Sequence, residues 1–151
     1  MYHQLRAAQG FLELGDPDSA WDELESIPPE DRAHPVALRL SVYIYREKKK
    51  WMEMAEISRH LTEIEPEQAE HWTNRAWAER RHQGIPVAEK TLLQALAKFP
   101  NEGLLYYNLS CYAAVDGRTV EAKSLLIKAI ELDPAFKGLA LEDEDLVGIR
   151  E

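Results

Sequence analysis

Five histidines, one cysteine and a few neighbouring carboxylates are the side chains of this 151-residue chain that could perform chemistry. The histidines are His3, His34, His60, His71 and His82. No two of them lie four residues apart around a glutamate, which is the spacing of a helical zinc site. Cys111 lies in the apolar stretch NLSCYAA, where we expect a buried, inert thiol, because a nucleophilic thiolate needs a neighbouring base.

Phosphate-binding and acyl-transfer motifs are also missing from the sequence. It contains neither a glycine-rich phosphate loop nor a GxSxG turn. We interpret Lys48-Lys49-Lys50 as a solvated loop, and carboxylate pairs such as Asp143 and Asp145 as surface groups. We therefore expect a protein that is not an enzyme and that has no cofactor and no metal.

The charge of the chain is unevenly distributed. Its net charge is −9, with −6 in residues 1–33, +1 in 34–137 and −4 in 138–151. Nucleic-acid binding requires a dominant basic face, so acidic ends around a balanced centre argue against it. No apolar run approaches the ~20 residues that cross a membrane, and a single cysteine gives no sign of an oxidising compartment. A cytoplasmic protein that binds neither nucleic acid nor membrane is the expectation.

Three prolines end helix-forming segments in the same way at a constant interval. Pro66, Pro100 and Pro134 are each 34 residues apart, and the segments before them read RHLTEIE, LLQALAKF and LIKAIELD. Such a period calls for a test for internal repeats. If each proline is placed at position 32 of a repeat, two amphipathic helical patterns fall within each repeat, separated by Gly84 in one case and Gly117 in the next.

Small residues recur at fixed repeat positions. Position 8 is Ala76 and then Ser110, position 20 is Ala88 and then Ala122, and position 27 is Ala95 and then Ala129. Small side chains let helix backbones approach closely, while the large ring at position 4 can fill the space between neighbouring helices. Neither helix can bury its apolar stripe alone, so we expect antiparallel pairs that stack in series.

This pattern resembles the tetratricopeptide repeat (TPR). The residues that carry the resemblance are Trp72, Ala76, Ala88, Leu92, Ala95 and Pro100 in one repeat, and Tyr106, Leu109, Ser110, Gly117, Ala122, Leu126, Ala129 and Pro134 in the next. The resemblance implies an all-α fold, a right-handed α-solenoid of about four helix-turn-helix repeats with a C-terminal capping helix. We expect one domain over 1–151, with repeats at 1–33, 34–68, 69–102 and 103–137 and a cap at 138–151.

Some segments depart from the repeat pattern. Pro28-Pro29 should cut the second helix of the first repeat short. In the second repeat Ala55 comes one residue late, which predicts a slightly long turn at EKKKW. Arg75 and Glu79 stand at positions that are usually apolar, so their helix is expected to pack less tightly. Asp143 or Glu144 could begin a short last helix.

In the family that the chain resembles, positions 2, 5, 9, 12 and 13 of each repeat face a concave groove. By that resemblance the groove here is rich in arginine and aromatic residues, the types that dominate interface energetics. The predicted partner-binding residues are Arg39, Tyr43, Arg46, Thr73, Trp77, Arg80, Arg81 and Tyr107. The Lys and Asn with which chaperone-binding members clamp a carboxylate are absent at positions 5 and 9, which disfavours a heat-shock-chaperone adaptor.

The sequence thus predicts a protein-interaction module, an adaptor or scaffold. Its groove would bind an extended or helical protein segment that carries Asp or Glu beside an apolar anchor. Two alternatives stay open. One is a structural unit whose repeats stack into a homo-oligomer, and the other is a secretion-type chaperone that shields an apolar segment of an exported protein.

Overall fold

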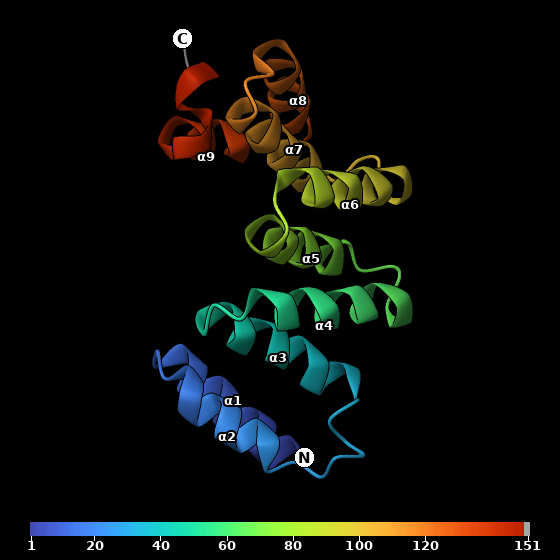
Figure 1. Cartoon of the computed structure of the whole chain (residues 1–151), viewed down its shortest axis with the longest axis vertical. Helices are drawn as coiled ribbons and strands as arrows, with labels where there is room; N and C mark the ends of the chain where they lie inside the picture. Colours follow the sequence, from blue (N-terminus) through green and yellow to red (C-terminus); the bar gives the residue numbers. More distant parts are fainter. Residues whose placement is uncertain (150–151) are drawn as a thin grey trace. The chain divides into compact units, whose positions relative to one another are not determined.

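The computed structural model describes residues 1–149, which are predominantly helical and contain no strand (Figure 1). The helices are α1 (Tyr2–Glu13), α2 (Pro17–Glu25), α3 (Pro35–Glu47), α4 (Trp51–Ile64), α5 (Ala69–His82), α6 (Ile85–Lys98), α7 (Gly103–Val115), α8 (Thr119–Leu132), α9 (Ala135–Glu142) and the 3₁₀ helix η1 (Glu144–Ile149). The last two residues of the predicted cap, Arg150 and Glu151, lie outside the described part.

Contacts divide the chain into two compact subdomains, and the boundary lies between Gly84 and Ile85. The N-terminal subdomain, Met1–Gly84, contains α1 to α5, and the C-terminal subdomain runs from Ile85 onward. The predicted repeats each hold one helix pair, but the boundary falls inside the third repeat, between its two helices. The expectation of a single domain therefore stays a prediction.

Capping side chains and prolines set where the early helices begin. Asp16 caps α2 by accepting hydrogen bonds from the Ser19 backbone N–H (3.1 Å) and hydroxyl (2.6 Å), and Pro17 follows at the first helical position. His34 caps α3, accepting from the Val36 N–H at Nδ1 (3.2 Å). As predicted, α2 is short and ends before Pro28-Pro29.

The turn of the second repeat differs from the prediction. It spans residues 48–50, the same length as the turns at 14–16 and 116–118. Lys49 has a φ of +57° and takes the role that glycine has at Gly15 and Gly117. The helix pair therefore stays in register, and the fully buried Met54, not Ala55, occupies the position of the small residue.

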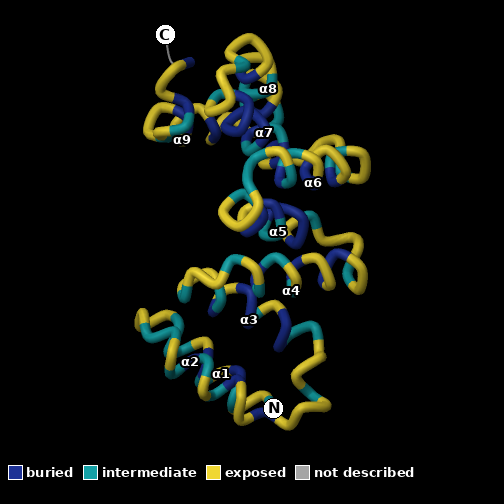
Figure 2. Tube along the Cα trace, viewed as in Figure 1, coloured by how far each residue is buried: buried dark blue, intermediate teal, exposed yellow. Residues whose placement is uncertain are grey.

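The small residues at the repeat positions are buried, and Figure 2 shows the buried stretches that run along the helices. Ala8, Ala20, Ala76, Ala88, Ala95, Ser110, Ala122 and Ala129 are all fully buried. In the N-terminal subdomain one apolar cluster joins α1, α2 and α3 through residues such as Leu24, Ile27 and Ile44. A second cluster, which includes Leu38, Met54 and Leu61, joins α3, α4 and α5.

Arg75 and Glu79 compensate for their polar character by interacting with each other. Their side chains pair at 3.4 Å across one turn of α5, and Glu79 is buried. The Arg75 guanidinium also lies 5.7 Å from the ring centroid of Trp72. Pairing lowers the cost of burying Glu79, because a buried charge with a partner costs far less than one without. The looser packing expected of this helix stays a prediction.

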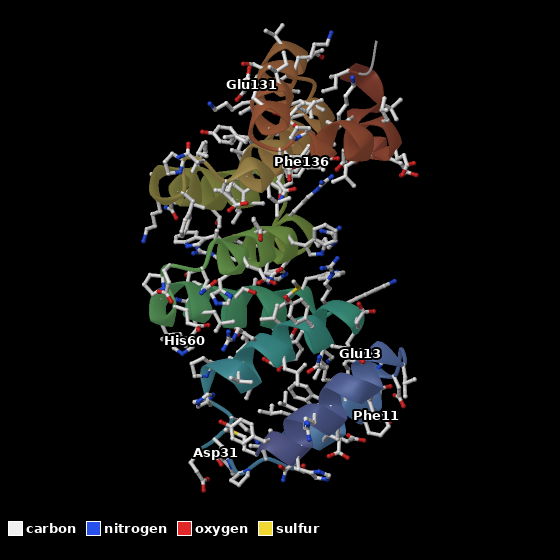
Figure 3. The ribbon with its side chains drawn as sticks, turned by 180° about the vertical axis from the view of Figure 1, so that it is seen from behind. Phe11, Glu13, Asp31, His60, Glu131 and Phe136 are labelled. Atoms are coloured by element: carbon white, nitrogen blue, oxygen red, sulfur yellow. The ribbon has the colours of Figure 1, made fainter. Side chains whose placement is uncertain are left out.

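The C-terminal cap begins earlier than predicted. Helix α9 starts at Ala135, directly after Pro134. The 3₁₀ helix η1 begins at Glu144, one of the two residues at which the sequence predicts a last helix, and the Asp143 carboxylate before it accepts from the Asp145 N–H (3.0 Å). Phe136 is buried and stacks on Tyr107 with ring centroids 5.0 Å apart (Figure 3). Within residues 1–149, no helix combines the length and apolar character that crossing a membrane requires.

Gly103 offers a test of this cap. A Cβ there would lie 2.8 Å from Cε2 of Phe136 and 3.4 Å from Cβ of Leu132. Gly103→Ala should cost about 1–3 kcal/mol through overpacking and regain about 0.5–1 kcal/mol from helix propensity. We expect a net loss of about 1 kcal/mol in the free energy of unfolding, measured by urea titration and circular dichroism.

The matched control is Gly138→Ala. Gly138 lies inside α9 with nothing within 4 Å of an added Cβ, so only the propensity gain applies and this variant should be more stable than wild type. A Gly103→Ala variant as stable as Gly138→Ala would show that the Phe136 contact does not hold the cap.

Candidate functional site

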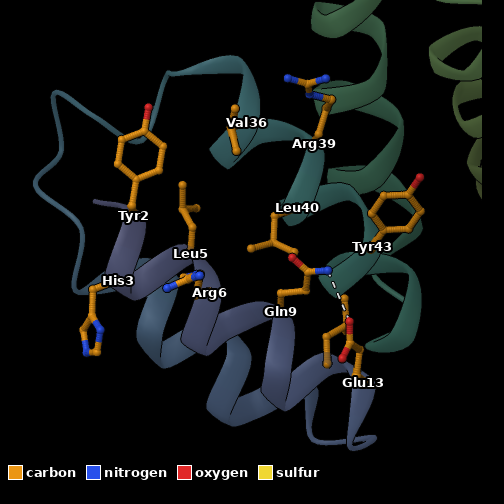
Figure 4. A pocket seen from close by; sticks show the side chains of 11 residues that line it. Tyr2, His3, Leu5, Arg6, Gln9, Glu13, Val36, Arg39, Leu40 and Tyr43 are labelled. Atoms are coloured by element: carbon orange, nitrogen blue, oxygen red, sulfur yellow. Dashed lines mark hydrogen bonds between the residues drawn. The ribbon is translucent and has the colours of Figure 1, made fainter.

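An open hollow of about 880 Å³ lies between α1 and α3, the first helices of the first two repeats (Figure 4). Its apolar lining comes from Leu5, Leu12, Val36 and Leu40. Its polar and aromatic lining comes from Tyr2, His3, Arg6, Gln9, Glu13, Arg39 and Tyr43. The spacing of Val36, Leu40 and Tyr43 by four and three residues explains why one face of α3 supplies them.

The polar groups around the hollow differ in how far they are already paired. Gln9 donates to the Glu13 carboxylate (3.2 Å). Arg39 lies 3.6 Å from the carboxylate of Glu65, which also pairs with His71. Arg6, in contrast, has no hydrogen-bond or ion-pair partner within residues 1–149. The hollow therefore carries a cation that is solvated rather than neutralised.

Tyr43 connects α3 to α5. Its hydroxyl donates to the carboxylate of Glu70, while its ring stays 36% exposed at the edge of the hollow. Partial burial first, and then Glu70, raise the pKa of this hydroxyl above its usual value. Tyr43 therefore remains a neutral hydrogen-bonding group with an accessible aromatic face.

Beyond Tyr43, two arginines gather on one tryptophan. The guanidinium of Arg46 (α3) lies 4.6 Å from the ring centroid of Trp77 (α5), and that of Arg81 lies 3.7 Å from it. Arg81 also lies 5.3 Å from the ring of Trp51 and donates to the Trp77 carbonyl (3.0 Å). Such stacking attracts a cation through the ring quadrupole. The hollow together with Arg46, Trp77 and Arg81 is called the inner face below.

The structure brings some of the predicted residues together and separates others. Arg39, Tyr43, Arg46, Trp77 and Arg81 all contribute to the inner face of the N-terminal subdomain. Thr73 is only 8% exposed, and its hydroxyl donates to the Glu70 carbonyl (2.9 Å), so it is a structural residue. Arg80 is half-buried on the same helix, in the last turn of α5.

Tyr107 is not an accessible groove residue. It belongs to the C-terminal subdomain and is 6% exposed, stacked on Phe136, with its hydroxyl donating to Asp143 (2.8 Å). Leu146, three residues after Asp143, is fully buried. The chain's own C-terminal segment therefore covers the side of α7 on which repeat positions 5 and 9 lie, which the repeat pattern alone could not indicate.

The same cap explains a cluster of metal-ligand types. Ligand atoms of Cys111, Asp143 and Asp145 lie within 4.8 Å of one another. Asp143 is already engaged by the Tyr107 hydroxyl and by the Asp145 N–H, and Cys111 Sγ lies 3.6 Å from it. These bonds make the cluster a hydrogen-bonded cap, and Cys111 is buried as predicted.

The helix pairs and their inner face define a TPR-like, all-α solenoid class of fold. Two solved structures of MamA share it: MamA 41-end from Desulfovibrio magneticus RS-1 and the MamA RS-1 ArsTM double mutant. The first matches with a TM-score of 0.72 at 15% identity over 96% of this chain and 86% of that one. The second matches with a TM-score of 0.73 at 15% identity over 96% and 85%.

At 15% identity this likeness establishes the fold and nothing further. No protein-family model and no curated protein sequence matches the chain.

Sequence reasoning missed several residues of the hollow. Tyr2 and Val36 stand at repeat position 2, which the resemblance assigned to the groove, so the signal for them existed. Arg6 and Leu40 stand at position 6, outside the assigned positions. The structure nevertheless places both among the residues that line the hollow.

Tyr107 gives a prediction of pH dependence. Burial first, and then its bond to Asp143, raise the pKa of its hydroxyl far above the ordinary 10.0, so the folded state keeps this proton at alkaline pH. The unfolded state loses it above pH about 10, so the stability that the hydroxyl contributes is intact below that pH and declines above it. Each further pH unit should lower the free energy of unfolding by about 1.4 kcal/mol relative to Tyr107→Phe.

Urea titrations of the wild type and Tyr107→Phe at pH about 8 and about 11 measure this difference. At the lower pH the variant should be less stable by about 1–2 kcal/mol, because Asp143 loses a donor. Tyr106→Phe removes a neighbouring hydroxyl that donates to the Pro100 carbonyl and is the matched control. A stability gap between wild type and Tyr107→Phe that is the same at both pH values would contradict the assignment.

Proposed function

We propose that this chain is a non-catalytic protein-interaction module, an adaptor or scaffold that binds a polypeptide segment of a partner on the inner face of its N-terminal subdomain. The observation that carries the proposal is the open hollow between α1 and α3, with its apolar floor and solvated Arg6. The TPR-like fold, which presents the first helices of its repeats on one side, supports it.

The shape and lining of the hollow favour a polypeptide. A volume of about 880 Å³ accommodates several side chains, and the floor is made of aliphatic residues that gain from being covered. The exposed rings of Tyr2 and Tyr43 flank it and can add apolar contact area without much loss of conformational entropy. An apolar anchor of one or two side chains is the ligand group that this floor fits.

The charges at the edge favour an acidic partner. Arg6 and Arg39 border the hollow, and Arg46 and Arg81 lie further along the inner face. Carboxylates in a partner segment could pair bidentately with such guanidinium groups. A nucleic acid is a poorer candidate, since the chain carries a net charge of −9 and Glu13 and Glu70 lie beside these arginines.

Self-assembly is a second candidate, favoured by apolar side chains exposed on the C-terminal subdomain. Val120 is 85% exposed, and Leu139, Leu141 and Val147 are each more than half exposed. Contact between copies could cover them. Light scattering at low and high salt separates this from the first candidate, because an apolar contact between copies survives added salt.

The first candidate is tested with a partner captured from lysate, reduced to a purified binding segment. The dissociation constant of the wild type is expected to be roughly micromolar, as for a small, partly charged interface. Tyr2→Ala combined with Arg39→Glu should weaken binding about tenfold or more, because an anchoring ring is lost and a cation becomes an anion. Fluorescence anisotropy measures both constants.

Arg59→Glu is the matched control, because Arg59 is also an exposed arginine with one glutamate partner, Glu63 on α4. Hydrogen exchange should show protection of amides in α1 and α3 on binding. Protection confined to other helices, together with equal binding by the double variant and the control, would refute the proposed site.

A further inference from the structure

We propose that Arg46, Trp77 and Arg81 form a carboxylate clamp, which holds an acidic side chain of the partner at a fixed distance from the apolar anchor in the hollow. This rests on the proposed function and specifies the partner: a segment in which Asp or Glu follows or precedes a large apolar residue at a set spacing. The clamp is a part of the inner face separate from the hollow.

The geometry of the clamp orients its cations. Both guanidinium carbons lie within 4.6 Å of the same ring centroid, so both cations are held against one indole. A guanidinium that lies over a ring uses its face for the stacking and keeps N–H groups at its edge for hydrogen bonds. Those edges match the two oxygens of a carboxylate, and stacking reduces the side-chain entropy that binding would remove.

Arg46 is the member of the clamp that has unused capacity for an anion. Within residues 1–149, no carboxylate lies at ion-pair distance from Arg46, whereas Arg39, Arg59 and Arg75 each have one and Arg118 has three. The indole of Trp77 is 37% exposed although it is the largest side chain on that side of α5. A carboxylate bound at this point would give Arg46 the ion-pair partner that it lacks within residues 1–149.

In the C-terminal subdomain a first helix of this chain already pairs with a carboxylate of the chain itself. On α7, at repeat position 5, the Tyr107 hydroxyl donates to the carboxylate of Asp143, and Leu146 three residues later is fully buried. The chain's own cap thus combines an acidic group with an apolar anchor. In the N-terminal subdomain the clamp would bind the partner's carboxylate in the way that the Tyr107 hydroxyl binds Asp143.

The positions along α3 set the spacing. Leu40 lines the hollow and Arg46 belongs to the clamp, and six residues of helix separate them by about 9 Å. A helical partner spans that distance with six or seven residues, and an extended one with about three. The expected signature is therefore an Asp or Glu six or seven residues from a Leu, Ile, Phe or Met in a helix, or three residues from it in a strand.

The probe is a displayed library of random twelve-residue peptides, selected against the full chain. Enriched peptides should carry that signature, and their synthetic copies should bind with dissociation constants that rise with salt. Arg46→Gln in the protein, or Gln in place of the acidic residue in the peptide, should each weaken binding about tenfold. Made together, the two changes should cost little more than one, because they remove the same contact.

Arg59→Gln is the control and should bind like wild type, and circular dichroism checks that each variant is folded. If enriched peptides bind in the hollow but lack the acidic residue, or if its effect is independent of Arg46, the clamp is wrong while the proposed function stands. If Tyr2→Ala combined with Arg39→Glu weakens the binding of no enriched peptide, the inner face is not the binding surface and both proposals fail.

Discussion

Close approach of helix backbones at alanine is the constraint on which the rest of the structure depends. Most of the helices carry an apolar stripe, α7 is apolar nearly all round, and helices of eight to fourteen residues are at best marginally stable alone in water. At positions such as Ala20, Ala88 and Ala122 the side chain is small enough for the next helix to cover that stripe. Once paired, the first helices of the N-terminal subdomain (α1, α3 and α5) have a remaining side, and that side forms the inner face.

The constraint also explains which parts of the fold could be predicted. Prolines and turn glycines mark chain positions directly, so several helix ends and the short α2 followed from the sequence. Lys49 and Met54 did not follow, because a lysine in a left-handed turn and a flexible methionine in place of an alanine are choices that tertiary packing imposes on residues without a local signal. The repeat pattern favours a small residue at position 20. It therefore assigns that position to Ala55 instead of Met54 and predicts a longer turn before it.

The candidate site was predictable in composition more than in geometry. The sequence indicated a surface rich in arginine and aromatic residues, and most of those residues do share one subdomain. Repeat positions could not show that Tyr107 is covered by residues far along the chain, since a cap that folds back is a long-range contact. Nor could they show that Arg46 and Arg81 share one indole ring, because stacking depends on side-chain rotamers.

The cap over α7 has a consequence for valency. Because the chain's own residues occupy that helix, a partner that carries several copies of the recognised segment would find one docking position per molecule in the N-terminal repeats. Avidity would then have to come from several molecules of this protein on one partner rather than from several sites on one molecule. The fraction of this protein that is bound would therefore rise with partner concentration as for a single site, without cooperativity.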